Sequence, residues 1–105
     1  MIEQAEFDAL VATYAKHGWV LRRVVLMDKT NATVATDPDI EIGQSVIDAA
    51  WFSRPPHPGP IAWEIRYFGL TPYALVEHID ENSPDFEQTL REVEERLASG
   101  VTSKE

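Results

Sequence analysis

The sequence contains no cysteine, and this absence excludes disulfide bonds, thiolate metal sites and a cysteine nucleophile. It has no apolar run that approaches the ~18 residues of a membrane-spanning helix. Its first residues include Glu3, Glu6 and Asp8 but no early lysine or arginine, whereas a secretory signal peptide begins with basic residues. We therefore expect a cytoplasmic protein that does not associate with membranes.

Basic residues are scarce: 9 lysines and arginines stand against 18 acidic residues, and the net charge is -9. Nucleic acids and anionic lipid surfaces bind to basic patches, so neither is an expected partner. The acidity is greatest in residues 77–105, which hold nine acidic and three basic side chains. We interpret this segment as a solvated helix face; the alternative is a docking surface for a basic partner.

Glycines are also few, and the 5 present are isolated from one another. A nucleotide-binding loop needs clustered glycines whose backbone N–H groups surround a phosphate, so the sequence predicts no nucleotide site. A metal site needs several converging ligands, and the best set available is His78, Asp80 and Glu64. Because that set depends on an assumed strand register, we predict no metal ion and no cofactor. The sequence identifies no small-molecule ligand.

The length of the chain is that of one domain. Its 105 residues are 44% hydrophobic and 26% charged, as is typical of a soluble globular protein. We expect a single α+β domain over residues 1–100. Gly100 is predicted to end the last helix, and residues 101–105 are predicted to form a frayed C-terminal tail.

Helical periodicity is clear at both ends of the chain. A helix is predicted over residues 2–17, with Gly18 in the left-handed position that follows a helix end. A second helix is predicted over residues 84–98, where a Ser-Pro pair marks the start. The side chains expected between these helices and a sheet are Phe7, Leu10, Tyr14, Phe86, Leu90 and Leu97. Two ion pairs at helical spacing are expected on the last helix: Glu87–Arg91 and Glu92–Arg96.

The strand pattern is strongest over residues 19–27, 61–68 and 73–79, and the last two form a hairpin. The first of these segments is apolar on both faces, which is typical of a strand inside a sheet. Arg22 and Arg23 are adjacent within it. Because side chains alternate along a strand, we expect these two arginines to point to opposite faces.

The middle of the chain has shorter patterns. Weaker strands are predicted over residues 32–36 and 40–42. A serine followed three residues later by an aspartate resembles a capping box and predicts a short helix over 44–52. The alternative is one helical turn followed by a strand through 50–54. Four prolines then exclude regular structure from residues 54–60.

The predicted element order is α-β-β-(β)-α-β-β-α. We expect an α+β fold, a two-layer sandwich in which an antiparallel sheet of about four to five strands carries the N- and C-terminal helices on one face. This element order is similar to that of the small acidic class of bacterial secretion chaperones. The similarity covers most of the chain, is one of topology, and assigns no functional residue.

Aromatic side chains flank the proline segment and the turn that follows it, and they are the candidate binding residues: Trp51, Phe52, Trp63, Tyr67 and Tyr73. Tryptophan and tyrosine are enriched at protein interfaces, but a small chain also needs large core side chains, and both interpretations stay open. If both helices cover one face of the sheet, the other face needs a cover. A second copy of the chain would supply it, so we predict a homodimer.

One acid–base pair is suggested by the hairpin. If Gly69 pairs with Tyr73, Glu64 lies across from His78, and a carboxylate–imidazole pair can transfer protons. Such cross-strand pairs are also common on protein surfaces, so we assign no catalytic residue and keep these two as candidates. The predicted function is a non-enzymatic protein-binding module of the chaperone, adaptor or immunity kind. The alternative is a small enzyme that uses Glu64 and His78.

Overall fold

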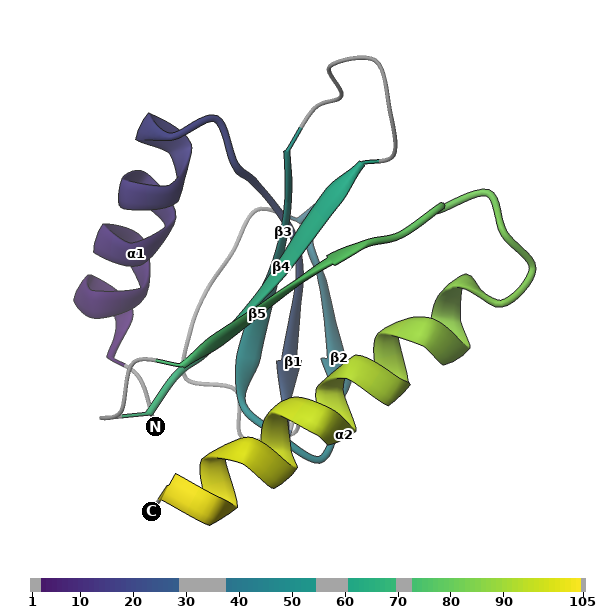
Figure 1. Ribbon diagram of the computed structural model, residues 1–105. Helices are drawn as coiled ribbons and strands as arrows, with labels where there is room; N and C mark the ends of the chain where they lie inside the picture. Colours follow the sequence, from purple (N-terminus) through teal and green to yellow (C-terminus); the bar gives the residue numbers. More distant parts are fainter. Residues whose placement is uncertain (1–2, 29–37, 55–60, 70–72, 105) are drawn as a thin grey trace.

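The computed structural model describes residues 3–28, 38–54, 61–69 and 73–104. A five-stranded sheet runs through the molecule, and a helix from each end of the chain packs against it (Figure 1). The fold is therefore α+β, as predicted. The elements in chain order are α1 (Gln4–Lys16), β1 (Val20–Leu26), β2 (Glu41–Gln44), β3 (Ala49–Arg54), β4 (Ala62–Tyr67), β5 (Ala74–His78) and α2 (Phe86–Lys104).

The sheet is mixed, with the strand order β2-β1-β3-β4-β5. β1 and β2 are parallel, whereas the other neighbouring strands are antiparallel. The prediction of a purely antiparallel sheet is thus wrong at β2. Parallel neighbours need a connection of about a dozen residues or more, and residues 27–40 supply that length. The predicted strand over 32–36 lies outside the described residues.

The strand β3 takes the place of the short helix that the sequence predicts over 44–52. β3 lies between β1 and β4, and Ala49–Ser53 are all buried. A strand covered on both faces is a continuous apolar run, and a short run of this kind cannot be distinguished from a buried helix by its period. Asp48 caps no helix but accepts a hydrogen bond from the backbone N–H of Met27 at 2.7 Å. The strand through 50–54 in the alternative prediction is confirmed, but the helical turn before it is wrong, since residues 45–48 are not helical.

The helices α1 and α2 lie on opposite faces of the sheet, so the predicted two-layer sandwich is wrong (Figure 1). Successive side chains of β3 show this: Ala49 and Trp51 belong to the core beneath α2, and Ala50 and Phe52 belong to the core beneath α1. Because β1 and β3 are apolar on both sides, each face needs its own cover. The premise of the predicted homodimer, a sheet face without a helix, is therefore removed.

Two hydrophobic cores result. The α2-side core joins α2 to β3, β4 and one side chain of β1. Its buried members are Val25, Ile47, Ala49, Trp51, Trp63, Ile65, Ile79, Leu90, Val93, Leu97 and Val101. The α1-side core is smaller, and its buried members are Phe7, Val24, Leu26, Ala50, Phe52 and Phe68. Since each large side chain gains about 1.5–3 kcal/mol on burial, the α2-side core contributes more to stability.

The helix α1 ends where the sequence predicts. Gly18 has a φ of 84°, the left-handed conformation that glycine adopts without strain. The next backbone N–H donates to the carbonyl of Tyr14 at 3.0 Å and turns the chain toward β1. Along α1, Phe7 is buried, whereas Leu10 and Val11 are half-buried against the α1-side core. The helix is thus attached along one narrow stripe.

The helix α2 continues through Gly100 to Lys104, so the predicted tail over 101–105 is wrong in its described part. Val101 is 6% exposed and belongs to the α2-side core, which favours the additional turn. Gly100 lies inside the helix and does not end it, in contrast to the prediction. A Cβ atom there would lie 2.6 Å from the hydroxyl oxygen of Tyr73, so glycine allows the helix to pass close to that ring.

The close ion pairs of α2 join it to distant elements, although the charge of Arg91 still lowers the pKa of Glu87 within the helix. Glu87 accepts two hydrogen bonds from Arg23 of β1, both 2.8 Å long, in place of one from Arg91. Arg96 donates to Glu77 of β5 at 2.6 Å, in place of the glutamate four positions earlier. These contacts attach α2 to both halves of the sheet.

A β-bulge in β1 places Arg22 and Arg23 on the same face of the sheet. Leu21 pairs with Phe52 and Arg23 pairs with Trp51, so one extra residue lies between the two pairs. The alternation of side chains shifts by one position there. The prediction that the two arginines point to opposite faces is therefore wrong, because it assumes a regular strand.

Both arginines of the bulge contact groups on the α2 side. Arg22 donates to Glu81 at 2.8 Å, and its guanidinium carbon lies 4.8 Å from the ring centre of Trp63 in the α2-side core. Arg23 holds Glu87 in the first turn of α2. The hydrogen bonds from Arg23 lower the pKa of Glu87 below its usual value of 4.5. The bulge thus supplies one cation that holds the first turn of α2 and one that holds the turn before it.

Candidate functional site

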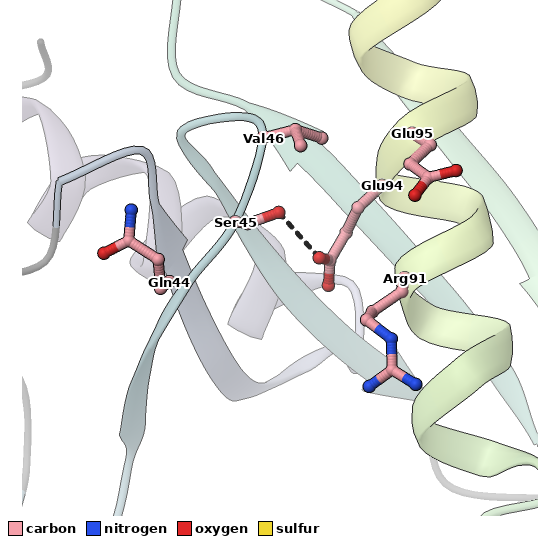
Figure 2. A pocket seen from close by; sticks show the side chains of 6 residues that line it. All are labelled: Gln44, Ser45, Val46, Arg91, Glu94 and Glu95. Atoms are coloured by element: carbon pink, nitrogen blue, oxygen red, sulfur yellow. Dashed lines mark hydrogen bonds between the residues drawn. The ribbon is translucent and has the colours of Figure 1, made fainter.

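A pocket of about 310 Å³ lies between the β2–β3 connection and the middle of α2 (Figure 2). Its lining residues are Gln44, Ser45, Val46, Arg91, Glu94 and Glu95. The two walls are distant in the sequence and meet because α2 crosses the sheet. The pocket therefore combines hydroxyl, apolar, cationic and anionic side chains in one place.

Glu94 is the buried charge of this pocket, with 5% of its surface exposed. One carboxylate oxygen accepts a hydrogen bond from Ser45 Oγ at 2.7 Å (Figure 2), and the other accepts one from Trp51 Nε1 at 2.9 Å. Among the described residues no cation forms a close ion pair with it, but its charge raises the pKa of Arg23. A carboxylate offers about four acceptor positions, so the two bonds leave acceptor capacity unused.

Arg91 and Glu95 lie at the rim of the pocket, and both are exposed. Glu87 is hydrogen-bonded to Arg23, and the charge of Arg91, one turn further along α2, also lowers the pKa of Glu87. An arginine four residues before a glutamate is the less favourable order for a helical pair, and Arg91 and Glu95 have this order. The rim thus offers one cation and one anion that are not bound to each other.

Glu64 lies opposite Val76 in the hairpin, whereas the enzyme hypothesis requires it to lie opposite His78. The register is shifted by two residues, since the N–H of Tyr67 donates to the carbonyl of Tyr73 at 2.9 Å. Such a shift leaves both candidate side chains on one face but displaces them diagonally. The geometry therefore gives no support to a direct acid–base pair.

Glu64 is bound by α1 instead. The phenol of Tyr14 donates a hydrogen bond to its carboxylate, and the Tyr14 ring stacks on Phe52 with 4.0 Å between ring centres. Burial, and then the hydrogen bond and charge of Glu64, raise the pKa of Tyr14 well above its usual value of 10.0. Tyr14 is thus a stable neutral donor that anchors α1 to β4.

The aromatic candidates lie in or beside the cores. Trp51 and Phe52 are 0% exposed and Trp63 is 2% exposed. Tyr67 and Tyr73 are half-buried and pack against the α2-side core. The three buried rings therefore offer no surface to a partner, and the two tyrosines offer little.

A second pocket, of about 170 Å³, lies beside the two arginines of the bulge. Trp63 and Phe86 form part of its wall, and Trp63 Nε1 is buried without a hydrogen-bond partner. Both arginines already bind carboxylates, and Asp39 and Glu41 add negative charge to the lining. We interpret the arginines here as structural.

The strand β5 forms an edge of the sheet. It pairs with β4 on one side, and no described strand pairs with its other side. On the face that α1 shares, its side chains Ala74, Val76 and His78 are exposed, and Val76 is 52% exposed. Because α1 lies over β1, it leaves this half of the face open to solvent.

Comparisons of the chain with protein-family models, curated proteins and solved structures found no match. The similarity of element order to secretion chaperones depended on a middle helix, which β3 replaces. Within the described ranges, no three histidine or acidic side chains are grouped to hold a metal ion. No helix in those ranges has the length and apolar character needed to cross a bilayer. Proposals about function therefore depend on the geometry given above.

Proposed function

We propose that the protein is a non-enzymatic protein-binding module that works as a homodimer joined through the free edge of β5. The observation that carries this proposal is the position of Val76, which is 52% exposed at the centre of an edge strand. An edge strand with an exposed apolar side chain favours pairing with another strand. The net charge of -9 favours partners that have basic surfaces. Such partners would bind to parts of the module other than the β5 edge.

A two-fold axis through Val76 gives an antiparallel pairing that is self-complementary. Each Val76 then lies against its counterpart, and Ala74 lies opposite His78 of the second copy. On the other face Leu75 lies opposite Glu77, whose carboxylate already has a counter-ion on α2. The pairing covers the exposed valine and gives partners to the edge of β5 that no described strand pairs with. It places no two like charges directly opposite each other.

Sedimentation equilibrium from micromolar concentration to about 1 mM tests the homodimer. The average mass is expected to rise above the 11.9 kDa of one chain as the concentration rises. The variant Val76→Lys is expected to stay monomeric, because a charged side chain on an edge strand opposes pairing. Val20→Lys is the matched control, since Val20 is 51% exposed and lies on β1 inside the sheet. It should dimerise like the unaltered protein.

Three results would count against the proposal. A single species of 11.9 kDa at every concentration would refute the homodimer. Equal loss of dimer in both lysine variants would refute the β5 interface. A synthetic peptide with the sequence of residues 73–79 should also bind the edge and shift the backbone amide resonances of β5. If it shifts none of them, strand addition is not the mode of recognition.

A further inference from the structure

We propose that the β5 edge binds an extended apolar segment of another protein, and that this segment displaces the second copy of the homodimer. The segment carries two consecutive apolar residues, of which one lies opposite Val76 and the next lies opposite Leu75. This inference rests on the proposed function, since it requires strand addition at β5. It adds the chemistry of the partner strand and the side chain that selects it.

Leu75 is the point at which the α2-side core reaches the edge of the sheet. It lies opposite Ile65, and Ile65 lies opposite Trp51, so the three side chains form one row across β5, β4 and β3. The two inner side chains are 0% exposed, whereas Leu75 is half-buried and packs against the same core. No strand in the described ranges continues this row beyond β5. An apolar side chain on an added strand would therefore extend the core by one position.

Val76 is the second apolar position, and it lies on the opposite face of the sheet. Its neighbours on that face, Ala74 and His78, are exposed as it is. Because successive side chains of a strand point to opposite faces, two consecutive residues of an antiparallel partner cover Val76 and Leu75 in turn. A pair of β-branched apolar residues fits both positions, and such residues also favour the extended conformation.

A second copy of this chain satisfies only one of the two positions. In the two-fold pairing Val76 meets its counterpart, but the next residue is Glu77, and this glutamate lies opposite Leu75 of the other copy. Its carboxylate is bound to Arg96 of its own chain at 2.6 Å, so a pair of charges lies beside the apolar row. Each copy also has a net charge of -9, and the two copies therefore repel each other. A less acidic segment with valine or isoleucine in the place of Glu77 removes the first mismatch and reduces the second.

Three synthetic peptides test this choice of partner: the sequence of residues 73–79, and the same sequence with Glu77→Val or Glu77→Thr. Each peptide is titrated into ¹⁵N-labelled protein, and the amide shifts of Ala74–His78 give its dissociation constant. The valine peptide is expected to bind about three- to fivefold more tightly than the unaltered peptide, because an apolar pair replaces a charge opposite Leu75. The threonine peptide is the matched control. It loses the charge and keeps the β-branched shape, but its hydroxyl does not extend the core, so it should gain less than the valine peptide.

The protein variant Leu75→Thr tests where the preference arises. Threonine keeps a high strand propensity but does not continue the apolar row, so the three peptides should bind this variant with affinities within about twofold of one another. Val20→Thr is the control, since Val20 is 51% exposed and lies on β1 inside the sheet. It should keep the full preference for the valine peptide.

Displacement of the second copy is measured by sedimentation equilibrium. At a concentration at which the protein dimerises, saturating valine peptide should lower the average mass to that of one chain with one peptide. A dimer that keeps its mass while the peptide is bound would show that the two do not share the β5 edge, and it would overturn the displacement.

The outcomes distinguish this inference from the proposed function. If no peptide shifts the β5 amides, strand addition fails and the inference fails with it. If the unaltered and valine peptides bind equally, or if the threonine and valine peptides do, strand addition stands and the inference is overturned. A preference that persists in Leu75→Thr overturns it as well. The peptide comparison uses the unaltered protein, so it decides the question even if Leu75→Thr does not fold.

Discussion

Truncation of Leu97 to alanine should remove a large part of the stability of this protein. Leu97 is 0% exposed and lies within the α2-side core. Loss of roughly three carbon atoms from a buried site costs about 2.4 kcal/mol at about 0.8 kcal/mol per carbon. The cavity left behind, of roughly 60–80 Å³, adds about 1.5–2 kcal/mol. We therefore expect a loss of about 4 kcal/mol, against a total of about 5–15 kcal/mol for a typical domain.

The matched variant is Leu10→Ala on α1. Leu10 is half-buried, and α1 is attached through a narrow stripe in which Phe7 is the buried side chain. Its truncation should cost about 1 kcal/mol, because less of the side chain leaves water and no closed cavity forms. Comparison of the two leucines thus measures how unequally the helices contribute to stability.

Urea denaturation followed by tryptophan fluorescence measures both free energies of unfolding. Trp51 and Trp63 lie in the α2-side core, so the signal reports the packing that Leu97→Ala disturbs. The slope of the free energy against urea should stay unchanged, which shows that the unfolded state is unaltered. A loss below about 1 kcal/mol for Leu97→Ala would refute the reasoning, and so would equal losses for the two variants.

Three further predictions concern single side chains. Tyr14→Phe should cost about 1–2 kcal/mol in urea denaturation, because a carboxylate loses its donor; in the unaltered protein the raised pKa of Tyr14 means that its phenol should not ionise near pH 10.0 in an absorbance titration. Arg23 lowers the pKa of Glu87, so their ion pair stabilises the folded state above pH 4.5, and this stabilisation is lost as the pH falls through the lowered pKa. Glu87→Gln should therefore reduce the acid dependence of stability by up to about 1 kcal/mol. Gly100→Ala should lower the melting temperature despite the better helix propensity of alanine, because its Cβ would lie 2.6 Å from Tyr73 Oη; a higher melting temperature would contradict the close approach.

The terminal helices, β1 and the β4–β5 hairpin could be predicted from the sequence because their signals are local. α1 has an apolar stripe at helical spacing and a glycine after its end, and β4 alternates between apolar and polar side chains. The face that each helix covers could not be predicted in this way. It depends on β3, whose residues Ala49–Ser53 are buried on both sides and therefore show no alternation.

The candidate pocket was inaccessible to the same reasoning. Its central contact joins Ser45 to Glu94, which are 49 positions apart. The sequence around Glu94 does not distinguish this buried glutamate from the exposed acidic residues of α2, because the helix face that packs against the sheet includes charged positions. The hairpin register is a similar case. Glu64 and His78 have suitable spacing for a pair in one register, and the turn that selects the register has no sequence signal that fixes it.

The bulge at Arg22 has a consequence for insertions and deletions in this chain. Deletion of that one residue would restore a regular strand in which Leu21 still pairs with Phe52 and Arg23 with Trp51. Leu21 would therefore stay in the α1-side core and Val20 would keep its face, whereas the cation that binds Glu81 would be lost. A related chain that lacks this residue can therefore keep the same order of side chains between Trp19 and Leu21. Alignments should accordingly place a gap at Arg22 rather than in the preceding turn.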